Sequence, residues 1–266
     1  MKNSMKPKVA VIIAHSFGET FETLKSQIQP SVWGRFAENE IDLFYILGKR
    51  PNFLQKALDV VSVRSRYSKY LWIIQRVMDR ATLDSRNKRL PKVQREGNTL
   101  RVDFPEGHRY MGVKMIAAFK YLFDQEYDII YRTTLSTVVI PENFRRAIDS
   151  IDNRYPFYGG TRVSFFEPNF VSGANLFLNR HTLRFILDNI EKWHHWDLDD
   201  VAIGKMLHGN IAISEFSSIN ISSLEDTKNI DYRNLGGAIH IRCKSNKVVR
   251  NDADIMLEVL RRLEST

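Results

Sequence analysis

The sequence has few of the features that would assign it to a specialised structural class. Its 266 residues include one cysteine, Cys243, so no internal disulfide is expected and a reducing compartment is favoured. The apolar runs are only as long as a strand, which predicts that no transmembrane helix is present. The N-terminal segment MKNSMKPKVAVIIAHS has too little apolar length for a signal peptide. We therefore expect a cytoplasmic protein.

Motifs of several common enzyme classes are also missing. No G-x-S-x-G sequence occurs, which argues against a hydrolase with a nucleophile elbow. Neither a P-loop nor a G-x-G-x-x-G sequence is present, so the common glycine-rich phosphate loops are excluded. His194 and His195 are adjacent and would point apart, and they have no cysteine or third ligand nearby. We therefore expect no metal site at these histidines.

The chain does carry an excess of positive charge, and the excess lies in one segment. The net charge is +8 and the pI is about 9.5. Residues 64–95 hold ten basic and two acidic residues, so this segment alone has a charge of +8. Interleaved aromatic and aliphatic residues predict a basic helical insertion over residues 60–95. Its interpretation stays open between a solvated helix and a surface for an anionic membrane or a polyanionic glycan lipid. Nucleic acid is not an expected partner, because no nucleic-acid motif accompanies the charge.

Apolar strand patterns alternate with helical patterns along the chain. A continuous β-branched run predicts a buried strand at Lys8–Ala14, a second strand is predicted at Ile41–Leu47, and alternation predicts another at Thr99–Phe104. Helical spacing predicts a helix at Tyr110–Phe123. Further helices are predicted at Thr20–Ile28, Glu142–Asp149, Asn179–Trp193, Val201–Leu207 and Asp252–Leu263. This alternation implies one α/β domain over residues 1–266, with a mostly parallel sheet flanked by helices.

The most informative segment is Tyr127–Pro141, with the sequence YDIIYRTTLSTVVIP. It predicts a buried strand that ends in a polar stretch, Arg132 to Thr137, followed by a second short apolar run. Ligand sites in α/β sheets lie beyond the carboxyl ends of the strands. We therefore expect hydroxyl groups and one cation at a ligand site on this edge of the sheet.

Two further segments carry candidate chemistry. Asp199 and Asp200 come just before a predicted helix, where carboxylates often serve only as helix caps. One of them can instead act as a general base on an incoming hydroxyl. The small residues Ser172-Gly173-Ala174 predict a loop that either lets a substrate approach the backbone closely or simply leads into a strand. The residues alone leave both alternatives open for each segment.

The order of these segments resembles that of GT-A glycosyltransferases, most closely the β-1,3-galactosyltransferase and fringe type. In chain order, Val9–Ala14 is similar to the family's first strand, Val32-Trp33-Gly34 to its tryptophan-containing helix end, and Phe44–Lys49 to its F-x-L-G strand. Tyr110–Lys114 is similar to the family's Y-x-N-L-T helix, and Tyr127–Ser136 to its acidic-triplet strand. Ser172–Leu176 is similar to its S-G-A-G turn, and Asp199–Gly204 to its E-D-V-x-x-G motif. The resemblance implies a GT-A, Rossmann-like fold with a nucleotide-sugar half (1–140) and an acceptor half (141–266).

The chain departs from the family at the acidic triplet, which in the family holds a divalent cation against the donor's diphosphate. Thr134-Leu135-Ser136 stands at the matching position, and hydroxyls without carboxylates are poor ligands for a hard cation. Two hypotheses follow. The protein is either a metal-independent transferase, or a non-catalytic nucleotide- or glycan-binding protein on the same fold.

A metal-independent transferase needs another positive charge for the leaving diphosphate. Alternation in the segment HIRCKSNKVVR places His240, Arg242 and Lys244 on one face of a strand. We predict that these three residues and Arg250 bind the diphosphate. The alternative is an exposed edge strand whose charges resist aggregation.

The resemblance also implies roles for individual residues. Asp200 would be the catalytic base of an inverting hexosyl transfer from a nucleotide-diphosphate sugar, a UDP-sugar in our prediction, to a glycan or glycolipid hydroxyl. The predicted donor-binding residues are His15, Ser16, Lys114, Arg132, Thr134, Ser136 and Asp199. The predicted acceptor-binding residues are Ser172, Gly173, Ala174 and Trp196. We expect no metal or other cofactor, and a role in surface polysaccharide or lipid-linked glycan synthesis at the membrane surface.

Overall fold

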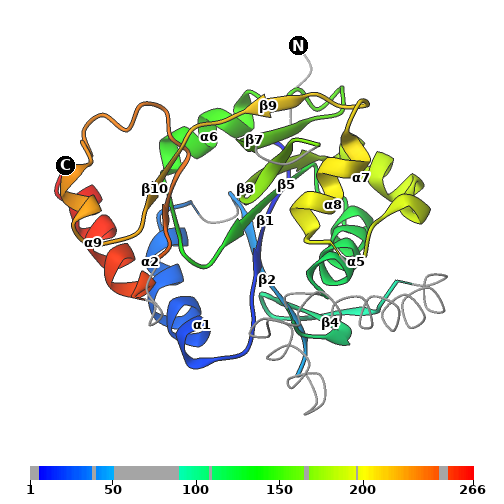
Figure 1. The fold of residues 1–266 in the computed structure, drawn as a ribbon, viewed down its shortest axis with the longest axis horizontal. Coiled ribbons are helices and arrows are strands. Elements are labelled where there is room, and N and C mark those ends of the chain that lie inside the picture. Colours follow the sequence, from blue (N-terminus) through cyan, green and yellow to red (C-terminus); the bar gives the residue numbers. More distant parts are fainter. Residues whose placement is uncertain are drawn as a thin grey trace, which may run out of the picture.

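The strands form two β-sheets, and helices cover both faces of the larger sheet (Figure 1). The computed structural model describes residues 6–37, 40–50, 90–107, 110–164, 168–195, 197–245 and 251–266. The predicted basic helical insertion over residues 60–95 falls largely on residues 51–89, outside the described residues. Trp196 and Arg250 also lie outside them.

The larger sheet has eight strands in the order β3-β4-β2-β1-β5-β8-β7-β9. Four of its seven neighbouring pairs are parallel, and β3/β4, β5/β8 and β8/β7 are antiparallel. The predicted α/β fold with a mostly parallel sheet is therefore confirmed. The strands are β1 (Val9–Ala14), β2 (Asp42–Lys49), β3 (Val93–Glu96), β4 (Thr99–Pro105), β5 (Ile129–Thr134), β7 (Tyr158–Val163), β8 (Phe170–Asn179) and β9 (Ile213–Glu215).

The first strand shows why its sequence is apolar without a break. Successive side chains of a strand point to opposite faces of the sheet. Val9, Val11 and Ile13 pack into the core on one face, and Ala10 and Ile12 pack into the core on the other. Because both faces of β1 are covered, neither set of positions can be polar.

Two layers of helices cover the two faces of the larger sheet. The first layer consists of α1 (Glu19–Thr23), η1 (Leu24–Ile28), α2 (Gln29–Trp33), α6 (Pro141–Asp149) and α9 (Asp252–Glu264). The second consists of α5 (Met111–Asp124), α7 (Arg180–Asp188) and α8 (Asp199–Leu207). In Figure 1 the two layers lie on opposite sides of the central strands. None of the described helices is long and apolar enough to span a lipid bilayer.

A second sheet of three strands joins the C-terminal part of the chain to the end of β5. Its order is β10 (Ser218–Ile221), β11 (His240–Cys243) and β6 (Thr137–Val139). Leu135 and Ser136 carry the chain from β5 in the large sheet into β6 in the small one. The backbone N–H of Cys243 donates to the carbonyl oxygen of Ser136 at 2.7 Å. The small sheet therefore holds β11 next to the carboxyl end of β5.

The structure corrects two predictions of local structure. Ser172-Gly173-Ala174 does not form a loop but lies inside β8. Gly160 pairs with Leu176 while Arg162 pairs with Val171, so β8 has extra residues between these pairs and bulges there, which explains its turn-like composition. The predicted helix Asn179–Trp193 is also interrupted, because α7 ends at Asp188 and a short 3-10 turn, η3 (Ile190–Lys192), follows.

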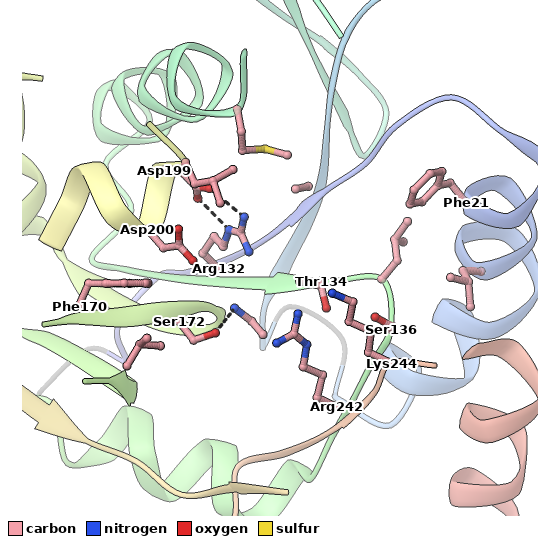
Figure 2. Close-up of a pocket in the computed structure, with 17 residues that line it drawn as sticks. Phe21, Arg132, Thr134, Ser136, Phe170, Ser172, Asp199, Asp200, Arg242 and Lys244 are labelled. Atoms are coloured by element: carbon pink, nitrogen blue, oxygen red, sulfur yellow. Dashed lines mark hydrogen bonds and ion pairs between the residues drawn. The ribbon is translucent and has the colours of Figure 1, made fainter. Parts of the chain in front are cut away.

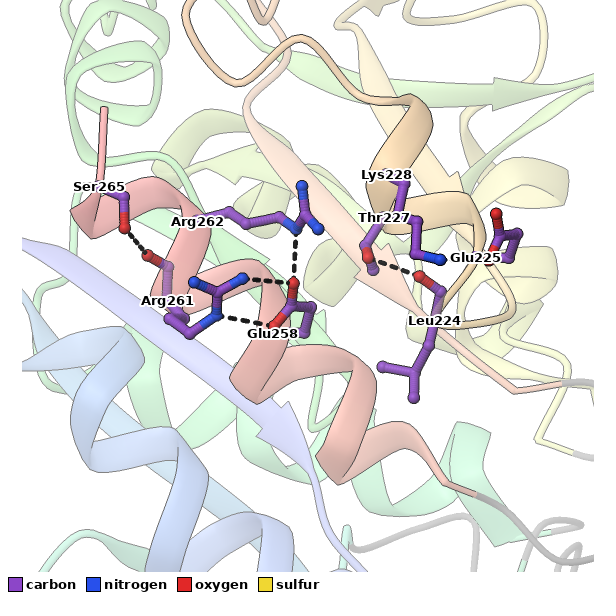
Figure 3. Close-up of polar contacts among 8 residues, drawn as sticks. All are labelled: Leu224, Glu225, Thr227, Lys228, Glu258, Arg261, Arg262 and Ser265. Carbon is purple, nitrogen blue, oxygen red and sulfur yellow. Dashed lines mark hydrogen bonds and ion pairs between the residues drawn. The ribbon is translucent and has the colours of Figure 1, made fainter.

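The C-terminal helix carries its own exposed polar contacts (Figure 3). Glu258 of α9 pairs with Arg261 at 2.8 Å and with Arg262 at 2.6 Å. In the neighbouring segment, Lys228 of η4 (Asp226–Asn229) pairs with Glu225 at 2.8 Å. Surface ion pairs of this kind contribute little to stability.

Candidate functional site

A pocket of about 410 Å³ opens at the carboxyl ends of β1 and β5 (Figure 2). This is the edge of the sheet at which the sequence predicted a ligand site. Acidic side chains from α8 lie on one side of the pocket, and cationic side chains from β11 and the residues after it lie on the other. The predicted residues that line it are Arg132, Thr134, Ser136, Ser172, Ala174, Asp199, Asp200, Arg242 and Lys244.

Arg132 and Asp199 form a buried ion pair in the pocket wall. The Nε and Nη2 atoms of Arg132 donate to the two carboxylate oxygens of Asp199, each at 2.9 Å. The remaining Nη1 atom donates to the carbonyl oxygen of Gly173. Burial raises the pKa of the Asp199 carboxyl above its usual value, and the Arg132 guanidinium opposes that effect. The guanidinium is therefore engaged by protein groups in this structure, and a direct contact with a donor stays a prediction.

Asp200 lies one residue further along, at the start of α8, and is half-buried. Its Oδ2 atom accepts from the backbone N–H of Gly173 at 2.9 Å, and its Oδ1 atom accepts from the N–H of Val201 at 2.9 Å. A carboxylate at a helix N-terminus is favoured by the helix dipole. These contacts direct the carboxylate toward β8, at the rim of the pocket.

Gly173 of β8 contacts Asp200 directly through its N–H, and its carbonyl oxygen accepts from Arg132, the partner of Asp199. A side chain at this position would place its Cβ atom 2.4 Å from Nη1 of Arg132. No larger residue can therefore occupy this position while the guanidinium stays on Asp199. The small residue at Gly173 therefore serves the close approach of the Arg132 side chain. A close approach of a substrate to the Ser172–Ala174 backbone stays a prediction.

Two other glycines allow α8 to lie against its neighbours. A Cβ atom at Gly204 would lie 2.3 Å from the Cβ atom of Phe170 in β8. One at Gly112, near the start of α5, would lie 2.7 Å from the carbonyl oxygen of Asp197. Gly204 thus lets α8 pack closely on β8, and this packing brings the first turn of α8 to the pocket.

The turn after β5 supplies two of the hydroxyl side chains that line the pocket, and Ser172 of β8 supplies a third. Thr134 and Ser136 line it, and the Oγ1 atoms of Thr134 and Thr137 lie 3.0 Å apart. Leu135 is buried, and its carbonyl oxygen accepts from the side-chain amide of Gln29 at 2.7 Å. Among the described residues, no group of three or more His, Cys, Asp and Glu side chains is placed to hold a metal ion.

Arg242 and Lys244 form the cationic side of the pocket. Arg242 belongs to β11, and Lys244 follows the end of that strand. Arg242 is half-buried and Lys244 is exposed, so the two cations extend from the sheet toward solvent. Figure 2 shows both side chains pointing toward the space beside Thr134 and Ser136.

His240 does not belong to this cationic group, which corrects the prediction for it. It is 1% exposed and does not line the pocket. Its Nδ1 atom lies 3.4 Å from the hydroxyl of Tyr131. Burial and then the nearby charge of Arg242 lower the pKa of His240 to about 3. The imidazole is therefore neutral and offers no charge to a diphosphate.

Lys114 is also placed differently from the prediction. Its ammonium group is fully buried, donates to Glu106 at 2.6 Å and to the carbonyl oxygen of His15 at 3.0 Å, and does not line the pocket. Glu106 in turn accepts from the backbone N–H of Gly48 at 2.6 Å. Burial lowers the pKa of Lys114, and Glu106 opposes this effect. The buried pair joins the ends of β1, β2 and β4 under the site.

His15 and Ser16 follow β1 but do not line the pocket. The His15 ring is buried, and its Nε2 atom lies 3.2 Å from Glu22. Burial and then the charge of Lys25 lower the pKa of His15. Gly173 lies behind the pocket wall, against Arg132. The roles predicted for Trp196 and Arg250 fall outside the described residues.

The apolar part of the pocket wall was not predicted from the sequence. Phe21 and Leu24 come from the helix after β1, Met111 from the start of α5, and Val163 and Phe170 from β7 and β8. The other apolar lining residues are Ala14, Leu135 and Leu198. The three-residue spacing of Phe21 and Leu24 on one helix face was the available signal.

No protein-family model matches the sequence, and no curated protein matches it. Among solved structures, the chain is similar to the apo form of the glycosyltransferase GlyE of Streptococcus pneumoniae TIGR4. The TM-score is 0.46 at 12% identity, over 97% of this chain and 63% of that chain. A second GlyE structure gives a TM-score of 0.41 at 11% identity, over 97% of this chain and 64% of that chain. The chain thus spans less than two thirds of these structures, and a likeness at this level carries no argument about activity.

Proposed function

We propose that the protein is a glycosyltransferase that moves a hexose from a nucleotide-diphosphate sugar to a hydroxyl of a glycan acceptor. One observation carries the proposal. A single pocket at the carboxyl edge of the sheet presents a carboxylate, Asp200, on one side and two cations, Arg242 and Lys244, on the other. A transfer reaction of this kind needs a base for the acceptor and a counter-charge for the leaving group.

Asp200 is the proposed base. The acceptor hydroxyl oxygen forms a bond to the anomeric carbon of the donor sugar, and its proton passes to the Asp200 carboxylate. The bond between the anomeric carbon and the diphosphate oxygen breaks, and its electron pair leaves with the nucleoside diphosphate. Attack from the face opposite the leaving group inverts the anomeric configuration. Gly173 and Val201 hold the carboxylate through their N–H groups, which supports a fixed orientation for this step.

Arg242 and Lys244 are the proposed counter-charge. The leaving diphosphate gains negative charge as the bond breaks, and cations fixed at that position stabilise it. The hydroxyls of Thr134 and Ser136 lie beside the cations and can donate to phosphate or sugar oxygens. In this proposal the two cations serve in place of a metal ion, because the turn at Thr134–Ser136 has no carboxylate.

The finer points of the proposal come from the sequence. A UDP-sugar is the proposed donor, and the acceptor is a surface polysaccharide or a lipid-linked glycan at the membrane surface. The segment at residues 64–95, whose charge motivates an anionic membrane partner, lies largely outside the described residues.

A calorimetric titration with UDP, followed by an assay of sugar release from a panel of UDP-sugars, tests the proposal. We expect UDP to bind and at least one donor to be hydrolysed slowly in water and transferred faster to a glycan acceptor. A matched titration with uridine tests the diphosphate contact, since uridine lacks the phosphates and should bind more weakly. Equal affinities for UDP and uridine would contradict the role of the two cations.

The second candidate is a nucleotide- or glycan-binding protein without catalysis. It is favoured by the fact that both carboxylate oxygens of Asp200 already accept backbone hydrogen bonds. For this candidate, UDP binds in the same titration, but no donor is turned over at any enzyme concentration.

A further inference from the structure

One buried side-chain amide connects the helix after β1 to the turn that supplies the pocket hydroxyls. Gln29, the first residue of α2, is 0% exposed. Its Nε2 atom donates to the carbonyl oxygen of Leu135 at 2.7 Å, and its Oε1 atom accepts from the indole Nε1 of Trp33. Leu135 lies between Thr134 and Ser136, and all three line the pocket.

The two partners fix the orientation of this amide. An indole N–H can only donate, and a backbone carbonyl can only accept. Trp33 therefore requires the amide oxygen on its side, and Leu135 requires the amide nitrogen on its side. A flipped amide would leave both partners unsatisfied in a buried site, which is costly. Stacking of Trp33 on Phe36, with ring centroids 5.6 Å apart, holds the indole in place.

The local helix geometry brings Gln29 to this position. A π-helical turn, η1, lies between α1 and α2, and Leu24 at its start lines the pocket. In a π turn, a backbone N–H donates to the carbonyl oxygen five residues earlier. Here the N–H of Gln29 donates to the carbonyl oxygen of Leu24. Pro30 follows at once and lacks the N–H that a regular helix would use.

The other end of the turn is held by the small sheet. The carbonyl oxygen of Ser136 accepts from the N–H of Cys243 at 2.7 Å, and Lys244 is the next residue. The turn is thus fixed at consecutive carbonyl groups, one bonded to Gln29 and the other to the strand that carries the cations.

We propose that Gln29, oriented by Trp33, is a positioning residue that holds the Thr134–Ser136 turn in the conformation that binds a diphosphate. What the turn binds rests on the proposed function, whereas the positioning itself does not. The proposal also gives a role to Trp33, which the resemblance singled out and the reaction does not use.

Gln29→Met tests the proposal, with Asn143→Leu as the matched control. Asn143 is also buried in the same core region and also donates its side-chain amide to a backbone carbonyl, that of Ala238, at 2.7 Å. Ala238 does not line the pocket. We expect both variants to lower the unfolding temperature. Only Gln29→Met should weaken UDP binding, by about fivefold for one lost hydrogen bond.

Amide hydrogen exchange gives a readout that does not depend on the ligand. Exchange in a peptide covering Thr134–Thr137 should be faster in Gln29→Met than in wild type, and unchanged in Asn143→Leu. If Gln29→Met does not fold, Trp33→Phe replaces it, since it keeps Gln29 and removes only the group that orients it. Unchanged exchange in the turn, or an equal change in the control, overturns the proposal. Faster exchange in a protein that does not bind UDP contradicts the proposed function and leaves the positioning role standing.

Discussion

Arg132 and Asp199 form a bidentate ion pair between the end of β5 and the start of α8, with both N–O distances at 2.9 Å. Both side chains are almost completely buried. The pair therefore serves first to join the strand to the helix that carries Asp200.

Breaking the pair should cost more than removing it. Arg132→Met or Asp199→Asn leaves one buried polar partner unmatched, and we expect a loss of about 3–5 kcal/mol in the free energy of unfolding. The double variant should lose less than either single variant, because it leaves no buried charge without its partner. Denaturant unfolding measures all three values. The exposed pair Arg162–Glu215 is the control, with an expected coupling of at most about 1 kcal/mol. Additive losses at Arg132 and Asp199 would show that the two residues are not coupled.

Asp200→Asn should remove turnover while UDP binding survives. An amide oxygen can still accept a hydrogen bond from Gly173 or Val201 but cannot take a proton from the acceptor. We expect the rate to fall by roughly 10²–10⁴-fold, the usual contribution of a general base. Asp197→Asn is the control, because Asp197 pairs with Lys205 at 2.7 Å and does not line the pocket. Wild-type turnover in the Asp200 variant would refute the base assignment.

Neutralising the cationic side of the pocket should weaken UDP binding. Arg242→Gln and Lys244→Gln each remove one charge, and we expect each to raise the Kd by about tenfold, as for a lost charge-assisted hydrogen bond. The control is Lys228→Gln, which removes the same charge from η4, away from the pocket lining (Figure 3). Weakening by an equal factor in the control would indicate a general effect of net charge.

A chelator should leave turnover intact. The turn at Thr134–Ser136 offers hydroxyls in place of the carboxylates that a hard divalent cation prefers. Initial rates of sugar release with EDTA, and after replacement of EDTA by excess Mn²⁺, provide the measurement. Loss of activity with EDTA and recovery with Mn²⁺ would show that the cations do not replace a metal.

Acidification should destabilise the protein through His240. The pKa of His240 is about 3 in the folded protein, compared with its ordinary value of 6.5. Between pH 3 and pH 6.5 the His240 side chain is therefore protonated in the unfolded chain but not in the folded protein. Stability present above pH 6.5 is therefore lost as the pH falls toward 3, by up to about 1.4 kcal/mol per pH unit. His15, whose pKa is also lowered, acts in the same direction. His240→Phe should reduce the slope of unfolding free energy against pH. An unchanged slope in the His240 variant would refute the assignment.

Most strands and helices of this protein follow from local pattern. The run Val9–Ala14 is apolar at every position, as a strand covered on both faces requires. The position of the ligand site was also predictable, because the carboxyl ends of parallel strands share one edge of the sheet. The bulge in β8 was not predictable, since its small residues are equally typical of a turn.

The α/β fold class, the edge of the sheet at which polar groups gather and the lack of a carboxylate at the Thr134–Ser136 turn can all be read from the amino-acid sequence. Which charges reach the pocket depends instead on how the elements pack together. His240 and Arg242 alternate alike along one strand, yet His240 is buried and neutral while Arg242 lines the pocket. Likewise Lys114 forms an ion pair with Glu106, and Arg132 forms one with Asp199. The charge that a side chain can offer to a ligand depends on its burial and its partners, and residues distant in the sequence set both.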